Sequence, residues 1–427
     1  MNSLKSLGQA FKVPEIRKKI IFTVLMLIIY RLGSCIPVPN IDRTVLSEYF
    51  SGASGLFGLF DMFSGGSFRN FTIFALSITP YVTASIILQL LTVVIPRLEA
   101  LSKEGTEGRK KIAQYTRYLT VVLALVQSIG LTVGLFRSAV VDQTFFSIAV
   151  IVITLTAGTA FLMWLGEQIN EHGIGNGISL IIMAGIVARM PSAIHQAFVK
   201  LQDGTVSIIS IIIFAIFAIA VIVGIIEVQQ GTRKIPVQYA KRVVGRKMYG
   251  GQNTHIPLKV NQAGVIPVIF SLSILQFPLT ITYFTNSASG FTQFVTKYLS
   301  PSGTPGVWIY SALNIVLIIF FTYFYTAITF NPMEVADNMK ANGGFIPGIR
   351  PGRSTVEYLS RVMTRITFAG AIFLAVIATL PTILGRFTEL GIEFGGTSLL
   401  IAVGVALDTM KQLESQLIMR NYSGFLK

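Results

Sequence analysis

The side chains that could do covalent chemistry or bind a metal are few and scattered in this 427-residue sequence. Its three histidines, His172, His195 and His255, are not spaced as metal ligands on one element are. The single cysteine, Cys35, excludes an intrachain disulfide and a cysteine pair for a metal. Zinc-protease, serine-hydrolase and Walker motifs are absent. The sequence therefore predicts no catalytic residue, no metal site and no cofactor.

Ionisable side chains inside apolar runs would point to proton- or ion-coupled transport, because such groups are costly in a bilayer. The runs are nearly free of such groups; Arg31, Glu227 and Asp408 each lie near the end of a run, where we expect a charge at the interface. A coupled transporter of small solutes therefore ranks second among the functions that we consider. The sequence shows no energy source of its own for transport. The uncharged polar side chains of the runs, which we expect to hydrogen-bond between helices, are Thr83, Gln127, Gln276 and Asn314.

The composition indicates an integral membrane protein, since 52% of the residues are hydrophobic and only 12% are charged, against about 25% charged in soluble proteins. Alternating strand patterns are absent, so we expect an all-α polytopic protein and not a barrel. A cleaved signal at the basic N-terminus is rejected because no small-residue cleavage site follows the first run. The sequence predicts ten transmembrane helices, over residues 20–36, 71–95, 115–135, 145–165, 177–190, 207–228, 262–284, 307–330, 362–384 and 397–412.

The positive charges lie mostly on one side of these ten spans. Of the 34 lysines and arginines, 26 fall on the side of the N-terminus and 7 on the other. Because positive residues favour the cytosolic side, both termini are predicted to be cytosolic. The net charge of +15 is then a property of the cytosolic face.

Two long basic segments, residues 229–260 and 331–361, hold much of that charge. We expect a strand, a hairpin tip and a return strand in the first, and a stiff tip of glycine and proline presenting Arg350 in the second. Attraction to anionic lipid explains the charge alone. Ordered loops favour a large acidic or anionic docking partner, such as a ribosome or an ATPase, over a scramblase or membrane scaffold.

The stretch GLFGLFDMFSGGSF, residues 55–68, is too short to span a bilayer and too apolar for water. Asp61 is its only charge, and Gly65 and Gly66 permit a sharp return. The residues alone leave two possibilities open: a hairpin resting on lipid head groups, or a segment covered by protein. Phenylalanines recur at every third position, as one face of a short helix requires: they are Phe57, Phe60 and Phe63.

Nine strings in order identify a resemblance over the whole chain. The sequence resembles the bacterial SecY family, the central subunit of the protein-translocation channel, and is similar to SecY of Bacillus-type bacteria. The strings are the NMFSGG-like DMFSGG (61–66), TPYVTASIILQLLTVVIP (79–96), KEGTEGRKKIAQYTRY (103–118), FLMWLGEQI (161–169), GIGNGIS (173–179), YAKRVVGRKMY (239–249), THIPLKVNQAGVIPVIF (254–270), FNPMEVADNMKANGGFIPGIRPG (330–352) and FGGTSLLI (394–401).

The resemblance implies two inverted, pseudo-symmetric halves, residues 1–200 and 201–427, around a central hourglass pore. It implies a plug at about 55–70, containing Phe57, Phe60, Asp61, Phe63, Gly65 and Gly66. The implied pore ring consists of Ile78, Val82, Ile178, Ile182, Ile269 and Ile401. The implied lateral gate, between the second and seventh spans, contains Thr83, Gln127 and Phe277.

The resemblance also implies a passive channel in the cytoplasmic membrane for unfolded secretory polypeptides, which releases hydrophobic segments into the phospholipid bilayer. Its implied partners are the small membrane subunits SecE and SecG, the ATPase SecA, the ribosome, signal sequences and polypeptide clients. The residues implied to dock SecA or the ribosome are Lys241, Arg246, Lys247 and Arg350.

Overall fold

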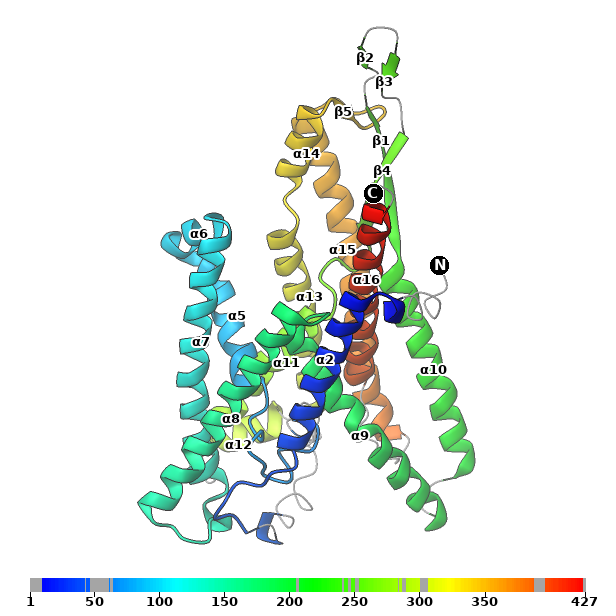
Figure 1. Ribbon diagram of the computed structural model, residues 1–427. Coiled ribbons are helices and arrows are strands. Elements are labelled where there is room, and N and C mark those ends of the chain that lie inside the picture. Colours follow the sequence, from blue (N-terminus) through cyan, green and yellow to red (C-terminus); the bar gives the residue numbers. More distant parts are fainter. Residues whose placement is uncertain are drawn as a thin grey trace.

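The computed structural model describes residues 10–42, 44–46, 61, 64–204, 207–239, 242–244, 247–249, 253–282, 284–285, 289–299, 306–387 and 396–424. Within these ranges the chain is an upright bundle of helices with a small sheet at one end (Figure 1). The helices are α2 (Pro14–Gly33), α5 (Thr79–Val94), α6 (Pro96–Lys103), α7 (Thr106–Ile129), η1 (Gly130–Leu135), η2 (Arg137–Ala139), α8 (Phe145–His172), α9 (Gly177–Gln202), α10 (Ile208–Gln230), α11 (Ile266–Thr282), α12 (Gly290–Tyr298), α13 (Gly306–Thr329), α14 (Pro332–Ala341), α15 (Arg353–Phe387) and α16 (Gly396–Gly424).

Every apolar run contains a helix, but the second run was predicted to start too early. Helix α5 begins at Thr79, and residues 71–78 form turns. The backbone explains the difference, because Phe71 and Ser77 have φ angles of 45° and 52°, which a right-handed helix excludes. By length and composition, six of the described helices can cross a bilayer, or seven if α5 and α6, bent by 101°, form one span. Helix α11 has only 17 residues.

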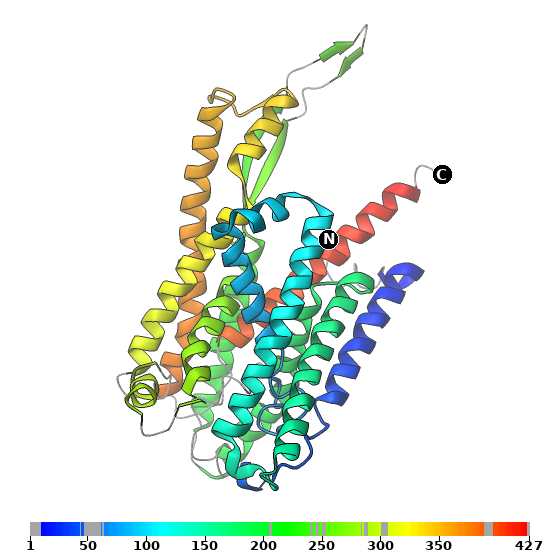
Figure 2. The same ribbon diagram turned by 90° about the vertical axis from the view of Figure 1, so that its left-hand side faces the viewer.

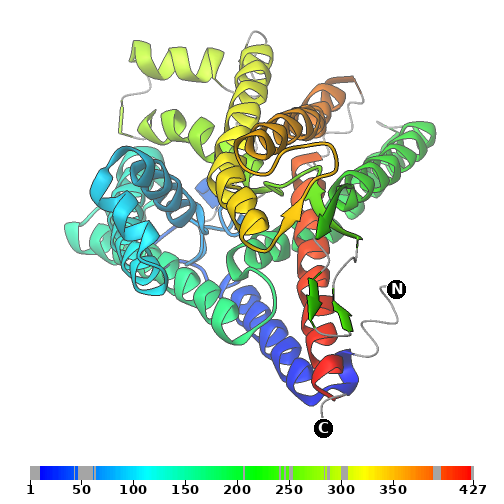
Figure 3. The same cartoon turned by 90° about the horizontal axis from the view of Figure 1, so that it is seen from above.

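The helices form one bundle with distinct ends. Helix α11 contacts α5 and α13, and α9 contacts α8 and α16, so elements from both parts of the chain meet at the centre. Viewed from above, α7 and α10 lie on opposite sides (Figure 3). The start of α2, the end of α16 and the sheet lie at the same end of the bundle (Figures 1 and 2).

The two basic segments fold together into one unit beyond the helices. Strands β1 (Thr232–Tyr239) and β4 (Asn253–Lys259) pair antiparallel, as predicted, and β2 (Arg242–Val244) pairs with β3 (Lys247–Tyr249) as a hairpin. Strand β5 (Gly344–Phe345), from the second segment, pairs with the other edge of β1. Ile235 and Val237 face a shared core with Met339 of α14. The two segments thus form one ordered extension of the helix bundle, with a hydrophobic core of its own.

The core of this unit gives a stability prediction. Ile235 is fully buried, so Ile235→Ala leaves a cavity that costs about 2–5 kcal/mol. We expect trypsin to cleave the basic segments at least about tenfold faster, because cleavage of an opened state follows its population. In Gln238→Ala, which alters an exposed side chain of the same strand, the rate stays within about twofold. Equal rates in the two variants would contradict the shared core.

Candidate functional site

A small apolar cavity lies where three helices meet near the middle of the bundle. Its volume is about 20 Å³, room for about one water molecule. Aliphatic side chains from α5, α9 and α11 surround it together with a few polar groups. The residues lining it are Ser77, Ile78, Thr79, Val82, Ile182, Ile269, Leu272, Ser273 and Gln276. Among the described residues, this space between the three helices therefore has room for little more than one water molecule.

Four of the six predicted ring residues line this cavity, and two do not. Ile401 is fully buried in the same core, on α16. Ile178 is partly buried, and its Cδ1 would lie 2.5 Å from a Cβ added at Gly166 of α8. Ile178 therefore packs toward α8 and does not face this cavity. One helical turn separates it from Ile182, so the two share a face of α9 but contact different neighbours.

The chain approaches this cavity through a folded segment, Asp61 with residues 64–78, which we call the return segment. Its backbone bonds to the strand-like residues after α2, with Val38 N donating to Phe71 O at 3.0 Å and Ile73 N donating to Ile36 O at 3.0 Å. Gly65 has a φ of 64°, and a Cβ there would lie 2.7 Å from the Cα of Gly185 on α9. The segment thus lies directly against α9. The predicted plug residues Phe57, Phe60 and Phe63 lie outside the described residues.

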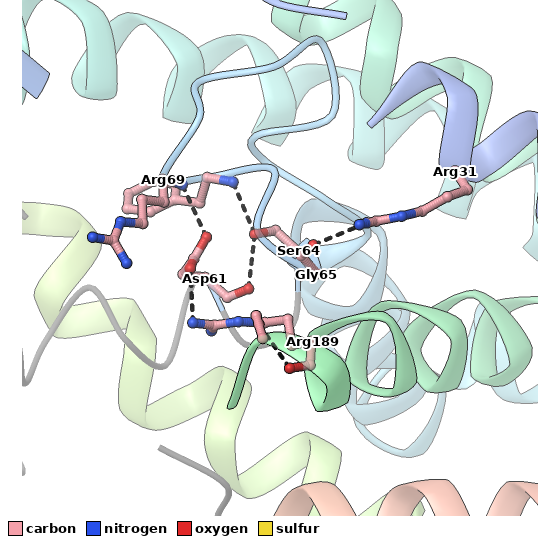
Figure 4. Close-up of polar contacts among 8 residues, drawn as sticks. Arg31, Asp61, Ser64, Gly65, Arg69 and Arg189 are labelled. Carbon is pink, nitrogen blue, oxygen red and sulfur yellow. Dashed lines mark hydrogen bonds and ion pairs between the residues drawn. The ribbon is translucent and has the colours of Figure 1, made fainter. Parts of the chain in front are cut away.

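The same segment is held by charged side chains (Figure 4). Asp61, whose side chain is 4% exposed, pairs with Arg189 of α9, with 3.2 Å between Oδ2 and Nη2. Its other oxygen accepts the backbone N–H of Arg69 at 2.9 Å. Arg31 of α2 donates to Gly65 O at 3.1 Å, so it is more than the interfacial charge that we predicted. Sequence reasoning missed Arg189, although a charge so near an apolar run was a signal for a buried partner.

The predicted gate helices α5 and α11 are in contact. The hydroxyl of Thr83 donates to Thr79 O of its own helix at 3.0 Å, so this bond does not cross the seam. Gln127 is buried on α7, and Phe277 is 47% exposed on α11. Gly130, just after α7, lies directly against the ring of Phe284, and a Cβ there would meet that ring. The end of α7 is therefore closely packed against the residues that follow α11.

One interhelical hydrogen bond lies behind the seam, where the sequence indicated one. Ser271 of α11 donates its hydroxyl to Asn314 Oδ1 of α13 at 2.6 Å. This bond joins α11 to α13 and does not involve α5. The helix also contains Pro278, which removes one backbone bond of a regular helix. Helix α11 is consequently tied more firmly to α13 than to α5.

Of the predicted docking residues, only Arg350 is described with its side chain. It is exposed between Gly348 and Gly352, which have φ angles of 80° and 104°. Thr355 donates its hydroxyl to Arg350 O at 3.0 Å, fixing the backbone of the tip. Lys247 lies in β3, and Lys241 and Arg246 lie outside the described residues. The tip thus presents the Arg350 guanidinium to solvent, as predicted.

Comparisons of sequence identify a family. A family model described as SecY matches residues 72–410. The chain is 51% identical over 444 residues to the protein translocase subunit SecY of Streptomyces coelicolor, covering 99% of this chain and all of that one. It is 49% identical over 434 residues to the same subunit of Halalkalibacterium halodurans, with the same coverage. The predicted likeness to a Bacillus-type sequence is confirmed.

Comparisons of structure support the same fold. The chain resembles a solved protein-conducting channel with a TM-score of 0.68 at 22% identity, covering 96% of this chain and 97% of that one. It resembles Sec61 of the canine ribosome-channel complex with a TM-score of 0.64, at the same identity and coverage. The fold is therefore that of these channels.

The contact between Gly65 and Gly185 predicts the cost of a single methyl group. Gly65→Ala places a side chain in a left-handed conformation, which costs about 1–2 kcal/mol, and overpacks α9, which costs about 1–3 kcal/mol more. Gly204→Ala is the matched control, because Gly204 has a φ of 70° and open space around it. We expect a larger fall in the thermal unfolding midpoint for Gly65→Ala in detergent. Equal falls would show that the segment does not press on α9.

Proposed function

The chain belongs to the SecY family, and from this membership we propose that it is a protein-conducting channel of the cytoplasmic membrane. It is a multi-pass membrane protein and a translocase subunit. In this proposal it passes unfolded secretory polypeptides across the membrane and releases hydrophobic segments sideways into lipid. It moves polypeptide without making or breaking covalent bonds. The observation that carries the proposal is the small aliphatic cavity where α5, α9 and α11 meet.

Aliphatic side chains suit the constriction of such a pore. Ile78, Val82, Ile182 and Ile269 offer no charge and no hydrogen bond, so they favour no particular client sequence and lose water when empty. Ile401 extends this surface within the same core. Ile178 lies one turn away against α8, and we assign it to the support of the ring. A constriction lined by ionisable side chains would instead bind ions or select clients by charge.

The return segment suits a plug on the outer side of this constriction. It approaches the cavity from the loop after α2 and lies against α9 through Gly65. Gly66, with a φ of 91°, continues the turn. We assign Phe57, Phe60, Asp61 and Phe63 to the same plug by their sequence positions. Covering by protein is favoured over a hairpin on lipid because the side chain of Asp61 is buried.

We propose the seam between α5 and α11 as the lateral gate. A signal sequence needs to separate these helices, and α11 is hydrogen-bonded to α13 on its other side. Thr83, Gln127 and Phe277 lie on the helices that flank the proposed gate. Interhelical hydrogen bonds in membranes contribute only about 1 kcal/mol each. A gate closed mainly by packing opens when a hydrophobic segment offers comparable packing.

The energy for transport then comes from partners at the basic unit. We propose that the unit of β1, β4, β5 and α14 binds the ATPase SecA or the ribosome, with Arg350 and, by their positions in the sequence, Lys241, Arg246 and Lys247 as contacts. This assigns the sheet end of the bundle, and with it both termini, to the cytosol. SecE and SecG are proposed as the small membrane subunits. An ordered surface favours protein or ribosome docking over attraction to lipid alone.

Crosslinking tests the proposed pore. In a Cys35→Ser background, Ile182→Cys is expected to crosslink to a stalled secretory chain that carries a thiol-reactive probe, because the chain must pass the constriction. Ile216→Cys on α10 is the matched control, since Ile216 is 63% exposed and does not line the cavity. Adducts at Ile216→Cys and none at Ile182→Cys would refute the pore.

Charge reversal tests the docking surface. We expect Arg350→Glu to lower SecA-driven export by about tenfold or more, because a like charge now faces the partner's acidic surface. Membrane insertion of the variant stays normal. The control is Lys340→Glu, an equal charge change at an exposed site of the same segment. Equal effects of both variants would favour general attraction to lipid and contradict a specific contact at Arg350.

A further inference from the structure

Two arginines from different helices hold the return segment in place (Figure 4). Arg189 of α9 pairs with the Asp61 carboxylate at 3.2 Å, and Arg31 of α2 donates to the carbonyl of Gly65 at 3.1 Å. Tyr30, next to Arg31, directs its hydroxyl to Ser64 O at 3.4 Å. The segment is therefore fastened from both sides. Only the contact from Arg189 joins two opposite charges.

The pair of Asp61 and Arg189 is largely removed from water. Their side chains are 4% and 20% exposed. Separating such a pair without hydrating both groups is costly, because a buried charge then loses the attraction of its opposite charge. The segment cannot leave α9 while its carboxylate stays buried. Docking of the segment and formation of the pair are therefore coupled.

Asp61 also organises the segment that it fastens. Its carboxylate accepts the N–H of Arg69 at 2.9 Å, and its backbone oxygen accepts the N–H of Gly66 at 3.1 Å. The hydroxyl of Ser64 donates to the same backbone oxygen at 3.1 Å. The carboxylate thus closes a compact turn with one oxygen and reaches α9 with the other.

One face of α9 receives this turn. Gly185 meets Gly65, and Arg189 follows Gly185 by four residues, which places both on the same side of the helix. Toward the start of α9, Ile182 lines the aliphatic cavity. A single helix therefore contributes to the constriction, supports the turn and supplies the charge that binds it.

We propose that Arg189 is a positioning residue, and that with Asp61 it forms a charge latch holding Asp61 and residues 64–69 against α9 in the closed channel. The inference rests on the proposed function, in which this segment is part of the plug. Opening requires the pair to separate and both charges to become hydrated. Closing restores the pair without any added energy source. The alternative is a purely structural pair that stabilises α9 and does not govern the position of the segment.

The accessibility of a buried reporter separates these alternatives. Ser67 is fully buried, and its hydroxyl has no hydrogen-bond partner among the described residues, so Ser67→Cys removes no bond of that hydroxyl. The reporter is placed in the full chain with Cys35→Ser, in lipid nanodiscs that leave both faces open. The rate of labelling by a water-soluble maleimide then measures how often the segment leaves its site.

The latch predicts a non-additive pattern. Asp61→Asn and Arg189→Gln are each expected to raise the labelling rate at least about tenfold, because each removes the charge attraction between these two side chains. The double variant is expected to label no faster than the faster single variant, since both remove the same interaction. Arg69→Gln is the matched control and leaves the rate unchanged, because Arg69 contacts Asp61 through its backbone N–H.

Two results would overturn the latch: a reporter that stays protected in both single variants, or effects of the two substitutions that multiply. Conservative rescue adds a check, since Asp61→Glu keeps the charge and is expected to label more slowly than Asp61→Asn. The proposed pore is judged separately, by ion leak from vesicles that contain Ile78→Gly with Ile182→Gly. An absent leak refutes the constriction, while the labelling pattern still decides whether Arg189 holds the segment.

Discussion

Apolar contact between α5, α9 and α11 is the interaction on which this structure depends. Apolar helices gain little by leaving lipid for one another, because both surroundings are equally apolar. In the proposed channel the aliphatic side chains around this cavity are different, because a wider opening between the helices would contain water. Excluding water from each such side chain contributes about 1.5–3 kcal/mol. Ile78, Val82, Ile182 and Ile269 would then be held together by the hydrophobic effect inside a membrane protein.

Polar interactions lie around this constriction and have a different role. Ser271 and Asn314 fix α11 to α13, while Arg31 and the pair of Asp61 and Arg189 fix the return segment. Apolar contact has no direction and adapts to any shape, whereas hydrogen bonds and ion pairs specify position. In the proposed channel, the apolar constriction can therefore change shape while α11 and the return segment stay in position.

Much of this arrangement was predictable from local patterns. Hydropathy located one helix in each of the ten apolar runs, because about 20 apolar residues are needed to cross a bilayer, and alternation located β1 and β4. The start of α5 was not predictable, since Phe71 and Ser77 adopt left-handed backbone conformations that their residue types disfavour. Local patterns also cannot show contacts between distant segments. The pairing of β5 with β1, the partner of Arg189 and the orientation of Ile178 toward Gly166 are all of this kind.

The short strand β5 gives the basic unit a mechanical property. Gly231 alone separates α10 from β1, and β1 is bonded on both edges, to β4 and to β5. Helix α14 follows α13 closely, and β5 leads through the tip to α15. A force applied at the tip would therefore reach α15 along the chain and α10 through the backbone hydrogen bonds between β5 and β1. The paired strands thus link helices that are far apart in the sequence at one end of the bundle.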